Sequence, residues 1–336
     1  MSSYLPLIIG LKGTSLNANE SNFLKNFKPW GVILFQRNCI NHKDTLNLIE
    51  DIKSKTHEDV PVLIDQEGGR VSRLNYPEFP KTLSAKIFGD IFAKDKTMAL
   101  RALTLNTDLI AGSLKKMGIN INTIPVLDLP SLNESGAIGD RAYASDKNTV
   151  SQMGEIVLSI NNSNGVGSVI KHIPGHGKAS VDSHFDLPTI TDELSVLENE
   201  DFIPFSNLKH ALLAMTAHAI YQKYDKDNVA TLSKTIINKI IRSKIGFNGT
   251  LITDDISMKA LSDDIGNNSF LALLAGCDVV MHCNGNFEEI SQIANKISSL
   301  DLISIDPNLL EIFQLKKTLN VEEVTGELAH ILTKFS

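Results

Sequence analysis

The feature that most constrains the fold of this chain is a series of eight short apolar runs separated by amphipathic stretches. Short, nearly continuous apolar runs bounded by Gly or Pro are typical of strands buried on both faces of a parallel sheet. The runs cover residues 5–11, 31–35, 61–65, 121–129, 167–172, 211–220, 249–255 and 276–283. Each run therefore predicts one strand of a buried sheet.

The stretches between these runs have the periodicity of helices. In 43–54, Leu46 and Ile49 are three residues apart and Leu48 and Ile52 are four apart, so each pair shares a helix face. Similar patterns predict further helices at 96–117, 148–164, 192–210, 234–245, 263–275 and 287–299. Eight strands alternating with helices favour an α/β fold, a single (β/α)8 TIM barrel. A doubly wound open sheet has the same alternation, and the strand number decides between the two.

The length and composition indicate one globular domain. Hydrophobic residues make up 42% of the 336 residues and charged residues 21%, which is ordinary for a folded protein and excludes extensive disorder. No Pro/Ser-rich linker or break in composition divides the chain. We therefore expect one catalytic domain over residues 1–336, with a C-terminal helical tail from about 306 to 336.

Charge and local composition predict where the protein acts. A net charge of −7 argues against a nucleic-acid partner. The N-terminal apolar run lacks a basic segment before it and stops at Gly10 and Lys12, and no run reaches the ~20 apolar residues of a membrane span. Cys39, Cys277 and Cys283 are expected to be reduced thiols. These features predict a cytoplasmic protein without a membrane partner, and a monomer is the simplest state.

Polar clusters follow several predicted strands, where the active sites of TIM barrels lie. One cluster, TDD at 253–255, places two carboxylates at the end of the seventh run. A buried anion is costly unless it is paired or used in chemistry. Capping of the next helix is the structural alternative. The local sequence leaves open whether Asp254 or Asp255 reacts.

A second cluster, KHIPGHGKASVDSH at 171–184, contains three histidines. Asp182 and His184 are two residues apart, so in extended backbone the carboxylate and imidazole face the same way. This pairing fixes the tautomer and favours the protonated ring that a general acid needs. A metal site is the competing interpretation. Its ligands would be His172, His176, His184, His218 and Asp254, but no HExxH helix occurs and a Pro-Gly turn separates the first two.

A third cluster, DQEGGRVSR at 65–73, follows the third run. Its Asp65 can accept hydrogen bonds from sugar hydroxyls, and Arg73 can bind carboxylate or carbonyl oxygens. Ion pairing within the cluster, which also holds Glu67 and Arg70, is the alternative. The adjacent glycines permit a tight turn. They are not a phosphate loop, because the chain contains no GxxxxGK[ST] pattern.

The combination of IDQEGGRVSR, IGDRAY, KHIPGHGKASVDSH and LITDDISM resembles glycoside hydrolase family 3 over nearly the whole chain. Within this family it is most similar to the single-domain bacterial β-N-acetylglucosaminidases of peptidoglycan recycling. The resemblance implies that Asp254 is the nucleophile, His184 the acid/base and Asp182 its partner. The implied substrate-binding residues are Asp65, Arg73, Arg141, Lys171 and His172. Ile173, Thr253 and Lys178 depart from the common pattern.

The resemblance also implies a reaction. Asp254 would attack the anomeric carbon, and His184 would protonate the leaving oxygen and later activate water. The overall reaction would be the retaining release of β-1,4-linked GlcNAc from 1,6-anhydro-muramyl peptide fragments, without a cofactor or a metal. A metal-dependent barrel hydrolase and a non-catalytic sugar-binding barrel are the alternatives. The latter would need no paired nucleophile and acid.

Overall fold

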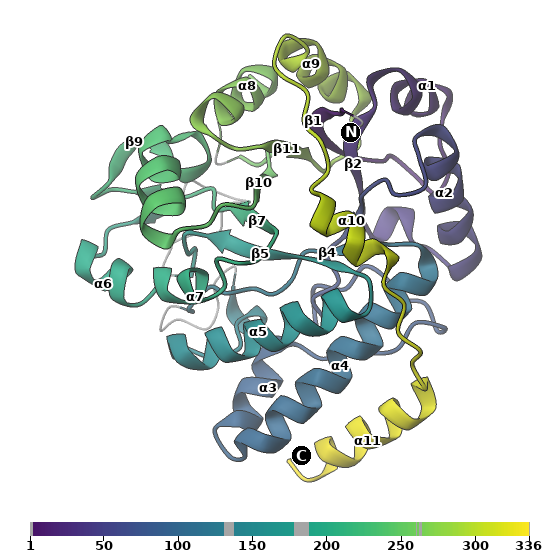
Figure 1. The fold of residues 1–336 in the computed structure, drawn as a ribbon, viewed down its shortest axis with the longest axis vertical. Helices are drawn as coiled ribbons and strands as arrows, with labels where there is room; N and C mark the ends of the chain where they lie inside the picture. The colour runs from purple at the N-terminus through teal and green to yellow at the C-terminus, as the bar shows by residue number, and fades with distance from the viewer. Residues whose placement is uncertain (1–2, 131–137, 178–187, 260, 262–263, 336) are drawn as a thin grey trace.

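Eight parallel strands, which lie between Leu5 and His282 in the sequence, form a closed barrel. The computed structural model describes residues 3–130, 138–177, 188–259, 261 and 264–335. Around the barrel the strands are ordered β1-β11-β10-β7-β5-β4-β3-β2, and β1 pairs with both β11 and β2 to close it (Figure 1). The strands are β1 (Leu5–Gly10), β2 (Pro29–Leu34), β3 (Val62–Ile64), β4 (Ile121–Asn122), β5 (Gly167–Ile173), β7 (Leu213–Thr216), β10 (Thr250–Asp255) and β11 (Val279–His282). The predicted (β/α)8 barrel and its eight strands are confirmed.

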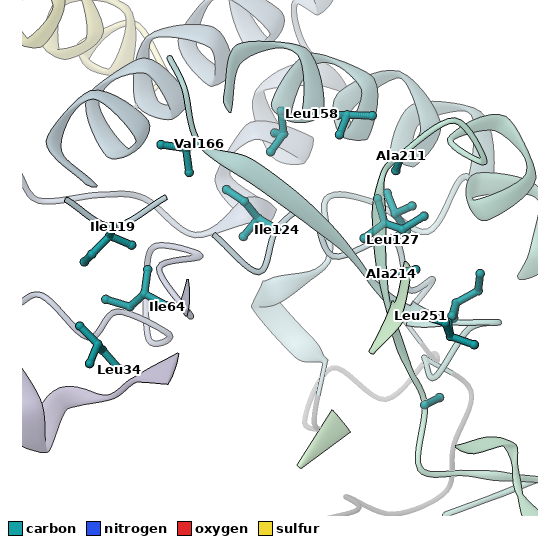
Figure 2. Packing of buried hydrophobic residues seen from close by; sticks show 14 of the residues in the cluster. Leu34, Ile64, Ile119, Ile124, Leu127, Leu158, Val166, Ala211, Ala214 and Leu251 are labelled. Atoms are coloured by element: carbon teal, nitrogen blue, oxygen red, sulfur yellow. The ribbon is translucent and has the colours of Figure 1, made fainter. Parts of the chain in front are cut away.

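The barrel strands are buried on both faces, which explains their continuous apolar runs. Alternate side chains such as Ile8, Ile33 and Leu63 pack inside the barrel. Their neighbours pack outward against the helices, and Figure 2 shows part of this outer layer, with Leu34 and Ile64 from strands and Leu158 from a helix. Because water reaches neither face, the sequence shows no polar alternation.

Helices surround the barrel, and local sequence sets their ends. Asp95 caps α4 (Lys96–Met117) by accepting a hydrogen bond from the Met98 amide, and Gly118 ends it in the left-handed region at φ 82°. The other helices are α1 (Ala18–Phe27), α2 (His42–Lys55), α3 (Ala85–Phe92), α5 (Lys147–Ser163), α6 (Leu194–Asn199), α7 (Phe202–Asn207), α8 (Ile265–Ala275), α9 (Phe287–Ile297), α10 (Pro307–Gln314) and α11 (Val321–Thr333).

Most predicted helices are confirmed, but two differ in form. The predicted helix over 192–210 is split into α6 and α7. Pro204 explains the break, because its ring lacks an N–H and would clash with the carbonyl of Glu200 in a continuous helix. The segment Ile236–Ile245 is a π-helix rather than an α-helix.

A small sheet that the apolar pattern does not predict lies beside the barrel. It consists of β6 (Thr189–Ile190), β8 (Ile220–Tyr221) and β9 (Asp225–Val229), with β8 in the middle. The Tyr221 hydroxyl donates a hydrogen bond to the carbonyl of Gly175, just after β5. The sheet is therefore tied to a segment that follows a barrel strand.

The chain ends in two helices, α10 and α11, within the predicted helical tail. Helix α11 packs against α4, and Arg101 binds both carboxylate oxygens of Glu327 across this contact (Figure 1). In the part of the chain that the structure describes, no helix is long and apolar enough to span a membrane. The assignment of residues 1–336 to a single catalytic domain stays a prediction.

Candidate active site

A cavity of about 220 Å³ opens at the carboxyl ends of the barrel strands. It brings together six residues that the sequence predicts for the site, namely Asp65, Arg73, Arg141, Lys171, His172 and Asp254. They come from the loop after β3, from a 3-10 turn at Gly139–Arg141, and from β5 and β10. Residues up to 189 positions apart in the sequence thus line one hollow, as expected for a barrel whose loops gather at one end.

A larger hollow of about 780 Å³ lies elsewhere, between the segments around Asn17 and Asn286. Its lining includes four asparagines, Lys12 and Glu288, and no histidine among the described residues. The smaller cavity is the better candidate because its acidic, basic and imidazole groups converge.

Asp254 and Asp255, the two carboxylates of the TDD cluster, lie in different environments. The side chain of Asp255 accepts hydrogen bonds from the Ser257 amide at 3.1 Å, the Ser257 hydroxyl at 2.8 Å and the Cys283 amide at 3.1 Å. Asp254 Oδ1 accepts a hydrogen bond from the Asp255 amide at 2.8 Å. Asp255 therefore holds the strand end in place, while Asp254 Oδ2 has no such anchor among the described residues.

The charge of Asp254 is stabilised by its surroundings. Burial alone would raise the pKa of this carboxyl, but the polar groups around it, which are the His218 and His172 rings, the Asp255 amide and Lys171, lower it below its ordinary value. The result is a carboxylate that is ionised at neutral pH, as a nucleophile must be.

His218 is fully buried, and both of its ring nitrogens are hydrogen-bonded. Nε2 donates to the backbone carbonyl of Asp255 at 3.0 Å, and Nδ1 accepts from the Thr231 hydroxyl at 2.7 Å. Burial lowers the pKa of the ring, so it is neutral. Its position in the metal alternative is weakened, because neither nitrogen is available to a metal in this arrangement.

Asp65 is held by two cations on the floor of the cavity. Arg73 Nη2 lies 3.0 Å from Asp65 Oδ2, and Lys171 Nζ lies 3.2 Å from Oδ1. Burial would raise the pKa of Asp65, but these two cations lower it well below the ordinary range. Arg73 Nε is buried and has no hydrogen-bond partner among the described residues.

Glu67 joins Arg141 to Lys171, whereas the sequence predicted ion pairs only within the cluster at 65–73. Arg141 Nε and Nη2 bind its two oxygens at 2.8 Å each, and Lys171 Nζ lies 2.7 Å from Oε1. Burial opposes ionisation, but Arg141 and Lys171 lower the pKa of Glu67 to about 2. Ion pairs thus connect the loop after β3, the 3-10 turn at Gly139–Arg141 and β5 along one side of the cavity.

Asp128 is a buried residue that the sequence analysis did not single out. It lies in the segment after β4 and contacts His172 Nδ1 at 2.6 Å and the His176 amide at 2.7 Å. The only signal in the sequence was an aspartate within an otherwise apolar run, INTIPVLDL. Burial, followed by the neighbouring His172, lowers the pKa of His176 to about 4, so that ring is neutral.

Glycines allow the loops to approach the barrel closely. Gly68 has φ 98°, and a Cβ on it would lie 2.2 Å from the Leu83 carbonyl oxygen. A Cβ on Gly177 would lie 1.7 Å from the Leu129 carbonyl oxygen. The double glycine of the third cluster therefore serves a tight turn and close packing.

The proposed acid/base pair, Asp182 and His184, lies outside the described residues, as does Lys178. Among the departures from the family pattern, Ile173 is buried at the end of β5, and the Thr253 hydroxyl accepts a hydrogen bond from the Met281 amide at 2.9 Å. Within the described ranges, no group of three or more His, Cys, Asp or Glu side chains is arranged to hold a metal ion.

Comparison with known proteins identifies the family. Residues 8–308 match the model described as the glycosyl hydrolase family 3 N terminal domain. A protein named β-hexosaminidase from Bordetella avium (strain 197N) is 31% identical over 283 residues, which cover 83% of this chain and 80% of that protein.

Two solved structures are also similar over nearly their full length. NagZ from Neisseria gonorrhoeae in complex with N-trifluoroacetyl-D-glucosamine has a TM-score of 0.84 and 26% identity, with 99% of each chain covered. The same protein in complex with a zinc ion has a TM-score of 0.80 and 25% identity, with 98% of each chain covered. This chain belongs to glycosyl hydrolase family 3 and is a glycoside hydrolase.

Proposed function

We propose that this protein is a retaining exo-β-N-acetylglucosaminidase that releases terminal GlcNAc from 1,6-anhydro-muramyl peptide fragments of peptidoglycan. The observation that carries the proposal is Asp254, an ionised carboxylate with one unanchored oxygen at a cavity walled by paired charges. The β-hexosaminidase name of a relative and the amino-sugar complex of a structural neighbour support the substrate class.

In this proposal Asp254 is the nucleophile and forms a covalent glycosyl-enzyme. His184 protonates the departing oxygen and then activates water, and Asp182 orients its ring; both roles rest on the family resemblance. The 2-acetamido group is recognised but does not act as the nucleophile. No step requires a cofactor.

The wall of the cavity supports recognition of a polar sugar. Asp65, Arg73, Arg141, Lys171 and His172 are proposed to bind its hydroxyl and acetamido oxygens. A charge-assisted hydrogen bond of this kind contributes about 1.5–3 kcal/mol.

The size of the cavity supports exo action. Its volume of about 220 Å³ is below the ~300–1,000 Å³ typical of pockets for larger ligands. A hollow of this size fits a single terminal sugar rather than an internal segment of a glycan chain. The aglycone would then lie outside the cavity, towards solvent.

The first test compares two chromogenic substrates, 4-nitrophenyl β-GlcNAc and 4-nitrophenyl β-glucoside, with and without EDTA. We expect hydrolysis of the first only, with no effect of EDTA, and proton NMR should show the β-anomer of GlcNAc as the first product. A first product of α configuration would contradict the retaining mechanism. Activity that EDTA removes and zinc restores would favour the metal-dependent alternative, for which the zinc complex of NagZ is a reason to include the control.

The proposed biological setting is cell-wall recycling. Action on muropeptides in the cytoplasm, during cell-wall recycling, is supported by the family resemblance and the similarity to NagZ. Mass spectrometry of a purified GlcNAc-anhydro-muramyl peptide after incubation with the protein tests it. Loss of one N-acetylhexosamine is expected, and an intact substrate in a preparation that hydrolyses 4-nitrophenyl β-GlcNAc would contradict this choice of aglycone.

A further inference from the structure

Asp128 is a fully buried carboxylate that binds two histidines of the site through both of its oxygens. Oδ2 lies 2.6 Å from His172 Nδ1 and 3.2 Å from the His172 amide. Oδ1 accepts from the His176 amide at 2.7 Å and lies 3.3 Å from the His172 amide. The cost of burying this charge is offset by three N–H groups that all point to it, and the His172 amide is shared between the two oxygens.

This pattern defines the orientation of the His172 ring. Burial alone would raise the pKa of Asp128, but His172 and its other partners lower it, so the carboxylate is ionised and can only accept hydrogen bonds. The proton in the 2.6 Å contact must therefore be on His172 Nδ1. The opposite nitrogen, Nε2, then remains for the cavity, which His172 lines.

We propose that Asp128 is a positioning residue for the glycosidase reaction, which acts by fixing the Nδ1 proton and the ring plane of His172 so that Nε2 meets the substrate. The proposal rests on the proposed function, because it assigns substrate contact to His172. Asp128 does not line the cavity itself, so it acts through the histidine. Such an arrangement, in which a partner on one imidazole nitrogen sets the role of the other, is common in enzyme sites.

The variant Asp128→Asn tests this mechanism because it inverts one hydrogen bond and preserves the others. The amide N–H groups of His176 and His172 need an oxygen acceptor, so the asparagine oxygen should take the place of Oδ1. The asparagine NH₂ group would then face His172 Nδ1. Since NH₂ only donates, Nδ1 must become the acceptor and the proton must move to Nε2.

The direct measurement is nitrogen-15 NMR of the imidazole rings, with the His172 signals assigned by their loss in His172→Ala. In the parent, Nδ1 of His172 should carry a proton at neutral pH. In Asp128→Asn the proton should be on Nε2. A parent protein with an unprotonated Nδ1 would overturn the proposal, and this readout does not require activity.

The kinetic measurement uses 4-nitrophenyl β-GlcNAc and calorimetric binding of GlcNAc. Asp128→Asn should lower kcat/KM by about 10- to 100-fold, the cost typical of a misplaced group in a site, and weaken GlcNAc binding. In a His172→Ala background the same substitution should have little further effect, because the two residues act as a unit. Equal losses in both backgrounds would show that Asp128 does not act through His172.

Asp108→Asn is the matched control. Asp108 is also a buried carboxylate, in α4, and it accepts from Asn164 Nδ2 at 2.8 Å and pairs with Lys317, but it does not line the cavity. Its variant should retain parental kinetics. If the parent shows no N-acetylglucosaminidase activity, the proposed function fails, whereas the NMR measurement still decides the tautomer.

Discussion

Adjacent residues of the same type can have different hydrogen-bond partners, as Asp254 and Asp255 show. The sequence places both at the end of one strand and cannot distinguish them. In the structure, three hydrogen bonds hold Asp255, two from Ser257 and one from the Cys283 amide, which is 28 residues further along the chain. Non-local contacts of this kind carry no signal in the TDD sequence itself.

The first residue-scale prediction compares the two aspartates. Asp254→Ala should lower turnover by about 10³-fold or more, as expected when a group that acts in the chemical step is removed. Asp255→Ala should keep much more turnover but lower the free energy of unfolding by about 1–3 kcal/mol, since it leaves buried donors unpaired. Steady-state kinetics and urea denaturation measure the two effects.

A covalent label checks this assignment independently. A slow 2-fluoro sugar substrate should leave its sugar on Asp254, and peptide mass mapping can locate it. A label on Asp255, or equal loss of turnover in both variants, would contradict the assignment of the nucleophile.

At the residue scale, the sequence motifs predict most of the described residues that line the cavity, but not Asp128, which holds His172 and His176. Asp65, Arg73, Arg141, Lys171 and His172 all line the cavity, as the family motifs implied. Asp128 was missed because a single aspartate in an apolar run does not reveal which side chains fold against it. The positions of Asp182 and His184 stay predictions.

At the scale of elements, charge pairs connect the loop after β3, the 3-10 turn at Gly139–Arg141, and β5. Glu67 is the central member, because it binds Arg141 through both oxygens and also contacts Lys171. All three side chains are largely buried. Removal of Glu67 would take away a carboxylate that Arg141 and Lys171 share in a region of low exposure.

The element-scale prediction follows from this geometry. Glu67→Ala should lower the free energy of unfolding by about 3–5 kcal/mol, the cost typical of breaking a buried ion pair by removing one partner. Glu67→Gln should cost less, because the amide oxygen still accepts one hydrogen bond. Urea denaturation of both variants measures the difference. Glu58→Ala is the control, since its pair with Lys53 is exposed on the glutamate side and should contribute less than about 1 kcal/mol.

If Glu67→Ala and Glu58→Ala lower the free energy of unfolding by the same amount, the ion pairs of Glu67 do not hold these loops together. The turns, including the tight turn at Gly68 and Gly69, would then stabilise this region instead.

The barrel was predictable from sequence because its strands are buried on both faces and its helices are amphipathic. The small sheet was not, because β9 has the sequence DKDNV and is exposed at its centre, so it lacks an apolar pattern. The division of α6 from α7 depended on Pro204, a local signal that the apolar periodicity over 192–210 does not contain. Burial patterns thus predict the layers, while edges and breaks depend on single residues.

At the scale of the whole molecule, the fold determines the charge state of its interior. It holds Asp65, Glu67, Asp128 and Asp254 ionised by lowering their pKa values. It also keeps His176 and His218 neutral, because burial lowers their pKa values too. Nearby cations and hydrogen-bond donors stabilise the charged form of the carboxylates, whereas burial destabilises the charged form of the histidines. The two kinds of group therefore affect stability in different pH ranges.

The whole-molecule prediction concerns stability in mild acid. The pKa of His176 is lowered from 6.5 to about 4, so between these values the unfolded chain binds a proton that the folded protein does not. Stability must then fall as the pH falls from 6.5 towards 4. The lowered pKa values of the carboxylates add their own loss only as the pH approaches the ordinary carboxyl range near 4 and below.

The pH range from 8 to 5 therefore isolates the histidines. Over the 1.5 units from 6.5 to 5, the contribution of His176 is about 2 kcal/mol, at 1.36 kcal/mol per unit. His176→Gln removes it, so the free energy of unfolding of this variant should fall by about 2 kcal/mol less than that of the parent between pH 8 and pH 5. Urea denaturation at several pH values measures how the free energy of unfolding of each protein changes with pH. The difference between parent and variant at pH 8 is the baseline. Part of the slope should remain in the variant, because His218 is also buried and neutral. Parallel curves for parent and variant would mean that His176 takes up its proton in the folded protein, and that the cavity carries one more positive charge in mild acid than its geometry implies.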